Sequence, residues 1–255
     1  GPLARRLGAG RPFLALESPG LGDGDTPETS VEALAARYSE ALREHQARGP
    51  YFLGGWSFGG VVAFEMARRL AARGERVSLL ALIDSRAPGS LPESSNPVDG
   101  SSLVAMLARE LGGGSASGND LNSAGDLDGV VERAKAEGLL PPEIRDAEVR
   151  RLLEVLRSNL KALRSYLPGI YPGRVTLFRA ADAAAPHRDP TLGWGEIAAG
   201  GVEVQRVPGD HYSMLREPHV HALAGELRAR LETAVAGASR APSAEQKKEA
   251  SGPGP

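Results

Sequence analysis

The stretch of sequence that decides the fold class is Tyr51-Phe52-Leu53-Gly54-Gly55-Trp56-Ser57-Phe58-Gly59-Gly60. It starts as an apolar strand, and glycines on both sides of Ser57 permit a turn so tight that the serine hydroxyl projects above a sheet. Residues 61–73 then have the composition of a helix, which Gly74 ends. The Gly-x-Ser-x-Gly pattern by itself is a weak signal, and a tightly packed or phosphate-binding turn is the alternative. Strand, turn and helix in this order predict a nucleophile elbow.

Outward from this elbow, the chain alternates between strand-like and helix-like segments, which is typical of a mostly parallel sheet covered by helices. Apolar runs predict strands, and apolar residues at helical spacing predict helices. The expected strands cover residues 13–16, 51–53, 77–83, 174–178 and 202–207, and the expected core helices cover residues 31–47, 61–73 and 217–233. The sequence therefore predicts one α/β domain over residues 1–236.

Between these core segments, residues 86–168 have a helical pattern without a convincing strand, and we interpret them as an insertion. The long helix expected over residues 145–166 carries one apolar face. The residues of that face that we expect to pack over the active site are Leu152, Leu156, Leu160 and Leu163. We expect the Gly- and Ser-rich residues 112–129 to be mobile and residues 237–255 to form a disordered C-terminal tail.

Composition narrows the class of protein. The chain has 255 residues, of which 41% are hydrophobic and 24% charged, as in a folded globular protein. Its formal net charge of −2 predicts neither nucleic acid nor an anionic membrane as a partner. No apolar run reaches the length of a membrane span and no signal-peptide core is present, so we expect a cytoplasmic protein. The absence of cysteine excludes disulfides and thiolate chemistry, and we expect no metal.

A serine nucleophile needs a base that accepts its proton. His211 is the well-placed histidine, because it follows the strand expected at residues 202–207 and so lies at the same edge of the sheet as Ser57. For the other histidines, a surface or helix-cap position is the simpler interpretation. These are His45, His187, His219 and His221. The sequence therefore predicts His211 as the general base.

The imidazole needs a carboxylate that orients it and stabilises its charged form. Asp84 and Asp182 each follow an expected strand, so spacing alone supports the two residues almost equally as the acid. Asp84 is the first polar residue after the apolar run 77–83, where a carboxylate persists with a strong partner. Asp182 lies among alanines in a loop that we expect to be exposed, so the burial argument favours Asp84. The chain order Ser, Asp, His is that of α/β-hydrolases.

Three motifs together resemble the thioesterase domains that end polyketide synthases and non-ribosomal peptide synthetases. They are the elbow with the following Phe64-Glu65-Met66-Ala67, the segment Ala81-Leu82-Ile83-Asp84, and Pro208-Gly209-Asp210-His211-Tyr212-Ser213-Met214-Leu215. The resemblance covers residues 3–235 and implies an α/β-hydrolase fold whose insertion is a lid over the acyl channel. It also selects Asp84 as the acid. The Phe58 amide, at the expected helix N-terminus, is placed to donate to the oxyanion.

The resemblance implies a function as well as a fold. A thioesterase domain of this kind releases an acyl or peptidyl chain from the phosphopantetheine thioester of a carrier protein through a Ser57 acyl-enzyme, by hydrolysis or macrocyclisation. The phosphopantetheine belongs to the carrier, so no cofactor is expected in this domain. The alternative enzyme is a free-standing proofreading thioesterase or a small-ester hydrolase. The alternative of another class is a non-catalytic docking module.

The resemblance also implies a feature upstream of the chain. The family has a first strand and a Gly-containing loop before the segment that matches residues 3–16, and this loop supplies the second oxyanion-hole amide. The sequence starts after that loop. The N-terminal strand of the fold is therefore expected to be missing from the chain. We interpret the chain either as a fragment of a longer protein or as a domain that was cut inside its N-terminal boundary, and we favour the fragment.

Overall fold

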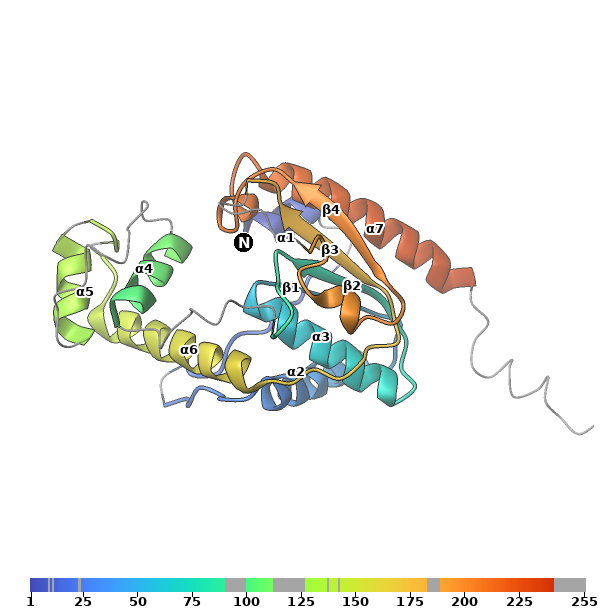
Figure 1. The fold of residues 1–255 in the computed structure, drawn as a ribbon, viewed down its shortest axis with the longest axis horizontal. Helices are drawn as coiled ribbons and strands as arrows, with labels where there is room; N and C mark the ends of the chain where they lie inside the picture. Colours follow the sequence, from blue (N-terminus) through green and yellow to red (C-terminus); the bar gives the residue numbers. More distant parts are fainter. Residues whose placement is uncertain are drawn as a thin grey trace, which may run out of the picture.

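The computed structural model describes residues 1–8, 10, 12–22, 24–89, 100–111, 127–136, 138–141, 143–182 and 189–240. Within these residues a four-stranded parallel sheet has the order β1-β2-β3-β4. The strands are β1 (Tyr51–Trp56), β2 (Val77–Ile83), β3 (Val175–Ala180) and β4 (Val202–Val207). Because all four strands point the same way, the loops that follow them gather at one end of the sheet (Figure 1).

Helices cover both faces of this sheet (Figure 1). On one face lie α2 (Val31–His45) and α3 (Phe58–Ala72), and on the other lie α7 (Val220–Arg240) and the short α1 (Pro2–Leu7). β2 contributes to the hydrophobic clusters on both faces. Leu80 and Leu82 pack in the cluster of α2 and α3, whereas Leu79, Ala81 and Ile83 pack in the cluster that includes α7 residues. Burial on both faces explains why residues 79–83 of β2 are all apolar.

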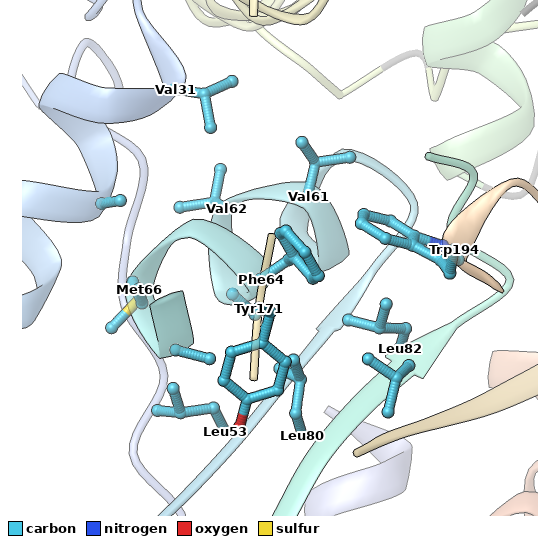
Figure 2. Packing of buried hydrophobic residues seen from close by; sticks show 14 of the residues in the cluster. Val31, Leu53, Val61, Val62, Phe64, Met66, Leu80, Leu82, Tyr171 and Trp194 are labelled. Carbon is cyan, nitrogen blue, oxygen red and sulfur yellow. The ribbon is translucent and has the colours of Figure 1, made fainter. Parts of the chain in front are cut away.

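The larger cluster contains a group of aromatic rings in edge-on and tilted contact, shown at close range in Figure 2. Phe64 of α3 is fully buried, and its ring centroid lies 5.8 Å from that of Tyr171 and 4.7 Å from that of Trp194. Trp194 starts the single-turn helix η1 (Trp194–Glu196) in the connection from β3 to β4. These contacts fix the β3–β4 connection on the core.

In the part of the insertion that the structure describes there are three helices, namely α4 (Gly100–Leu111), α5 (Leu127–Ala136) and α6 (Asp146–Ser165). They stand beside the sheet at the left of Figure 1. The helices share a hydrophobic cluster of their own, to which Leu103, Val131 and Leu153 contribute. Of these three helices, α6 alone joins the cluster of the sheet in the described residues, through Ala162 and through Tyr166 directly after the helix. The insertion is thus a small layer with a separate core.

A buried polar network attaches α6 to α3. Glu65 is fully buried, and its carboxylate accepts two hydrogen bonds from the Arg68 guanidinium, at 2.7 and 2.8 Å. The Tyr166 hydroxyl donates to the same carboxylate at 2.7 Å. Burial, followed by the bond to Glu65, raises the pKa of Tyr166 far above its ordinary value, so this hydroxyl remains a donor at any physiological pH.

The expected strand at residues 13–16 is absent. This segment has no regular secondary structure, and Phe13, Leu14 and Leu16 are 55%, 51% and 43% exposed. A strand needs a neighbour that takes up its backbone hydrogen bonds, and no described strand pairs with these residues. The apolar run was therefore insufficient to predict a strand. The Tyr38 hydroxyl of α2 donates to the Glu17 carbonyl oxygen and tethers the end of the segment.

The apolar face of α6 packs mainly within the insertion. Leu152, Leu156 and Leu160 lie against the cluster that α4, α5 and α6 share. Leu163 packs against the cluster of the sheet. The periodicity correctly predicted one buried face, but the neighbours of that face come from the insertion itself.

Two expected flexible segments overlap ordered helices. Residues 127–129 belong to α5, and residues 237–240 belong to α7. The remaining parts of those predictions, residues 112–126 and 241–255, lie outside the described residues. None of the helices in the described part of the chain is both long and apolar enough to cross a membrane.

Candidate active site

Ser57 lies in the sharp turn between β1 and α3. Its φ of 52° and ψ of −123° place it in a backbone region that costs a non-glycine residue about 1–3 kcal/mol. Close backbone packing imposes this turn. A Cβ at Gly55 would lie 2.1 Å from the Gly59 carbonyl oxygen, and a Cβ at Gly60 would lie 2.5 Å from the Cβ of Ser85. The strand, turn and helix expected from the sequence are therefore present, with glycine required on both sides of the serine.

His211 lies in the loop after β4, and its Nε2 atom is 3.1 Å from Ser57 Oγ. Two aromatic rings flank the imidazole. The Trp56 ring lies 4.9 Å away with a tilt of 30°, and the Tyr212 ring lies 5.0 Å away, nearly perpendicular. The Trp56 indole N–H also donates to the His211 carbonyl oxygen at 3.0 Å. The residue before Ser57 thus fixes the loop that carries the imidazole.

Asp84 directly follows β2 and faces the other side of the same imidazole. Its Oδ2 atom lies 2.7 Å from His211 Nδ1, and its Oδ1 atom accepts a hydrogen bond from the Ala180 amide at 3.0 Å. The Asp84 amide in turn donates to the Phe178 carbonyl oxygen at 2.7 Å. Backbone contacts with the end of β3 therefore set the position of the carboxylate.

Asp84 remains ionised in this environment. Burial by itself raises the pKa of a carboxyl, but hydrogen bonds from His211 and the Ala180 amide, together with the charges of His211 and Arg86, lower the pKa of Asp84 below its ordinary value of 3.8. An ionised Asp84 favours the tautomer of His211 with the proton on Nδ1. That tautomer leaves Nε2 able to accept the proton of Ser57.

The other carboxylate considered from the sequence, Asp182, does not contact His211 through its side chain. It is exposed, as expected, but its carboxylate accepts a hydrogen bond from the Gly209 amide at 3.0 Å. Of the remaining histidines, His221 in α7 pairs with Glu217, which lies just before that helix. His187 lies outside the described residues. The structure therefore brings together Ser57, His211 and Asp84, as the sequence predicted.

Phe58 is the first residue of α3. The first amides of an α-helix have no acceptor within the helix and carry its partial positive charge. The Phe58 amide therefore lies directly after the serine, in an arrangement that suits a developing oxyanion. Among the residues that the structure describes, no group of His, Cys, Asp or Glu side chains is arranged to hold a metal ion.

Comparison with known proteins assigns the family. The chain matches the family model described as Thioesterase domain over residues 2–231. The chain belongs to the thioesterase family. This thioesterase domain is 34% identical over 228 residues to a non-reducing polyketide synthase of Arthrinium sp, an alignment that covers 84% of the chain and 11% of that protein. The domain spans 6%, 11% and 25% of the length of three curated relatives.

Solved structures agree with this assignment. A four-domain non-ribosomal peptide synthetase bound to AMP and glycine matches with a TM-score of 0.79 and 29% identity, covering 89% of this chain and 18% of that one. The NocB thioesterase domain in covalent complex with a fluorophosphonate nocardicin G analogue matches with a TM-score of 0.61 and 29% identity, covering 85% and 81%. The predicted resemblance to thioesterase domains of polyketide and peptide synthetases, and the predicted α/β-hydrolase fold, are confirmed.

Sequence reasoning missed several residues around the site. Trp56 belongs to the elbow motif, but its contact with the imidazole was not predicted; its position directly before the serine is the signal that points to it. Tyr212, directly after His211, is a comparable case. The contact of Trp194 with Ser85 joins residues 109 positions apart, and no local pattern predicts it.

Proposed function

We propose that this thioesterase domain releases an acyl or peptidyl chain from a carrier-protein thioester through a covalent intermediate on Ser57. The observation that carries the proposal is the continuous line of contacts from Ser57 Oγ to His211 Nε2, at 3.1 Å, and from His211 Nδ1 to Asp84 Oδ2, at 2.7 Å. A nucleophile, a base and an orienting carboxylate in this order are the parts that acyl transfer needs.

In the first half-reaction, Ser57 Oγ attacks the thioester carbonyl carbon while its proton passes to His211 Nε2. The negative charge on the carbonyl oxygen is stabilised by the Phe58 amide, and the charge on the imidazolium by Asp84. The carbon–sulfur bond then breaks, and the leaving sulfur takes the proton from His211. The products are an ester of Ser57 and a free thiol.

In the second half-reaction, an oxygen or nitrogen nucleophile attacks the ester carbon and gives its proton to His211. Water gives a free acid, and a hydroxyl or amine of the bound chain gives a ring. The carbon–oxygen bond to Ser57 breaks, and the serine recovers its proton from His211. The same three residues serve both outcomes, so the release route depends on which nucleophile the pocket admits.

The partner in this proposal is an acyl or peptidyl carrier protein, which brings the phosphopantetheine thioester. Two findings support it. The relatives are synthases and synthetases far longer than this chain, and one structural neighbour is a four-domain peptide synthetase. A domain that forms a small part of such a protein receives its substrate from a neighbouring domain of the same assembly.

Active-site labelling tests the proposal. A fluorophosphonate should add its phosphoryl group to Ser57, which intact-mass measurement and peptide mapping detect, and Ser57→Ala should abolish both labelling and turnover of an acyl thioester. Mass spectrometry of the products from a panel of linear acyl thioesters would then distinguish free acids from rings. A protein that is neither labelled nor active would indicate a non-catalytic docking module instead.

A further inference from the structure

The connection between β3 and β4 contacts the loops that carry His211 and Asp84, although it contributes none of the three proposed catalytic residues. On the histidine side, the contact is reciprocal. The Asp182 amide donates to the Gly209 carbonyl oxygen at 3.1 Å, and the Gly209 amide donates to the Asp182 carboxylate at 3.0 Å. Asp182 therefore binds both the amide and the carbonyl group of Gly209, which lies two residues before His211.

On the acid side, the same connection binds the residues that follow Asp84. The Trp194 indole N–H donates to the Ser85 carbonyl oxygen at 2.8 Å, and the Ala87 amide donates to the Leu192 carbonyl oxygen at 2.9 Å. Trp194 and Ser85 are both fully buried. Removing the indole N–H group would therefore leave the buried Ser85 carbonyl oxygen without its Trp194 donor.

The backbone of Asp84 explains why such contacts matter. Its φ is 41°, a left-handed value that a non-glycine residue keeps only where the surroundings impose it. The adjacent peptide of Ser85 is held by Trp194, whose ring is itself fixed against Phe64 at 4.7 Å. The core therefore holds the indole N–H group that donates to the acid loop.

We propose that the β3–β4 connection positions the triad, with Trp194 as the positioning residue for Asp84 and Asp182 as the positioning residue for His211. This inference rests on the proposed function, because it assumes that the three residues act together. A positioning residue acts on the geometry of proton transfer and does not touch the substrate. Its loss therefore lowers kcat and leaves KM unchanged.

Trp194→Phe tests the acid side, because it keeps a buried ring and removes the N–H group. We expect kcat for an acyl thioester to fall by about 10- to 100-fold, with KM unchanged. Tyr171→Phe is the matched control. Tyr171 is also buried, and its ring centroid lies 5.8 Å from that of Phe64. The change therefore removes one polar atom from the same group of aromatic rings and leaves the contacts of the acid loop in place. The control should keep the parent kcat, and thermal unfolding of both variants should show that each is folded at the assay temperature.

Asp84→Asn supplies the readout that separates positioning from a general structural defect. If Trp194 acts through Asp84, Trp194→Phe lowers kcat in the parent but adds little in the Asp84→Asn background. An equal further loss in that background would overturn the inference and leave the proposed triad intact. Asp84→Asn with the parent kcat would instead overturn the proposed triad, and the inference with it.

The histidine side has an independent pair of variants. Asp182→Ala removes the acceptor of the Gly209 amide, whereas Asp182→Asn retains a side-chain oxygen in the same place. We expect Asp182→Ala to lower kcat by about 10-fold without a change in KM, and Asp182→Asn to restore kcat to within about 2-fold of the parent. A parent-like kcat for Asp182→Ala would remove Asp182 from the inference.

Discussion

Three described residues other than glycine have a positive φ, namely Ser57, Asp84 and Leu192. The first is the proposed nucleophile, the second is the proposed acid, and the third accepts a hydrogen bond from the loop that carries the acid. Backbone strain in the described chain is thus concentrated around one site. Such strain persists where the surrounding structure imposes it, and it is characteristic of sites whose geometry must be set before the substrate arrives.

Gly60→Ala tests how closely the elbow must approach the acid loop. The new Cβ would lie 2.5 Å from the Ser85 Cβ and 3.0 Å from the Gly55 carbonyl oxygen, so the two loops must separate. We expect kcat to fall by about 10²-fold and the melting temperature to fall as well. Gly225→Ala, at a helix position in α7 where the added Cβ meets nothing within 4 Å, is the control and should keep the parent kcat. Similar kcat values for the two variants would contradict this account.

The two aspartates are distinguished by amide substitutions. Asp84→Asn removes the charge that selects the His211 tautomer, so we expect kcat to fall by up to about 10⁴-fold. Asp182→Asn keeps an oxygen that can accept from the Gly209 amide, so kcat should change little. Steady-state kinetics on one acyl thioester measures both. The reverse result would assign the acid to Asp182.

At the level of single elements, apolar residues predicted strands with different degrees of burial. β2 and β4 have the predicted bounds. Residues 79–83 of β2 are all apolar and buried, whereas β4 carries Glu203, Gln205 and Arg206 between its valines and is mostly half-buried. Residues 13–16 have a similar run but no partner strand, and pairing is a property of the fold rather than of the segment. The amphipathic helix α6 was likewise predicted, but the identity of its neighbours was not, since a periodic face does not specify what covers it.

In the candidate site, too, the features that depend on a single segment were predictable and the contacts between distant segments were not. Ser57, Asp84 and His211 were predictable because Ser57 and Asp84 directly follow strands and His211 lies in the loop after β4, and the carboxyl ends of parallel strands meet at one edge of a sheet. Trp194 and Asp182 hold this site through hydrogen bonds to backbone groups of distant loops. Any side chain with the right donor or acceptor can make such a bond, so residue type gives no signal.

Tyr166→Phe tests the attachment of α6 to α3. It removes the hydroxyl that donates to the buried Glu65, while Arg68 keeps its two bonds to that carboxylate. We expect a loss of about 1.5–3 kcal/mol in the free energy of unfolding, or faster amide exchange in the C-terminal turns of α6 if the helix detaches locally. Ser165→Ala, which removes an exposed hydroxyl bonded within α6 itself, is the control. Unchanged stability and unchanged exchange in Tyr166→Phe would show that the network does not attach the helix.

At the scale of the whole molecule, several carboxylates make stability depend on pH. Hydrogen bonds from Thr191 lower the pKa of Asp189, and hydrogen bonds led by the Ser213 amide lower the pKa of Asp210, both below the ordinary value of 3.8. The pKa of Asp84 is also below this value, although burial by itself raises it. A carboxyl with a lowered folded-state pKa contributes stability above its unfolded pKa and loses that contribution as the pH falls through the folded value. These groups therefore predict acid destabilisation below about pH 4.

Asp189→Asn checks the sign of this effect. The variant lacks the charge to which the Thr191 hydroxyl and the Thr191 and Gly193 amides donate. We expect its melting temperature to lie below that of the parent at pH 7 and to approach the parent value at pH 3, where the parent carboxyl is also becoming protonated. Thermal unfolding by circular dichroism at both pH values measures the difference. A gap of the same size at pH 3 would mean that the charge of Asp189 is not its source.

The separate core of the insertion bears on how such domains diversify. Because Leu103, Val131 and Leu153 pack among α4, α5 and α6 and not against the sheet, substitutions there leave the packing around Ser57 and His211 undisturbed. Selection, or a designer, can therefore exchange these helices as a unit, provided that the Glu65–Tyr166 attachment and the hydrogen bond from Arg216 to the Arg109 carbonyl oxygen of α4 are retained. A chimaera with the insertion of a related domain would keep the sheet and the residues Ser57, Asp84 and His211 unchanged, so the insertion and the catalytic frame could change independently.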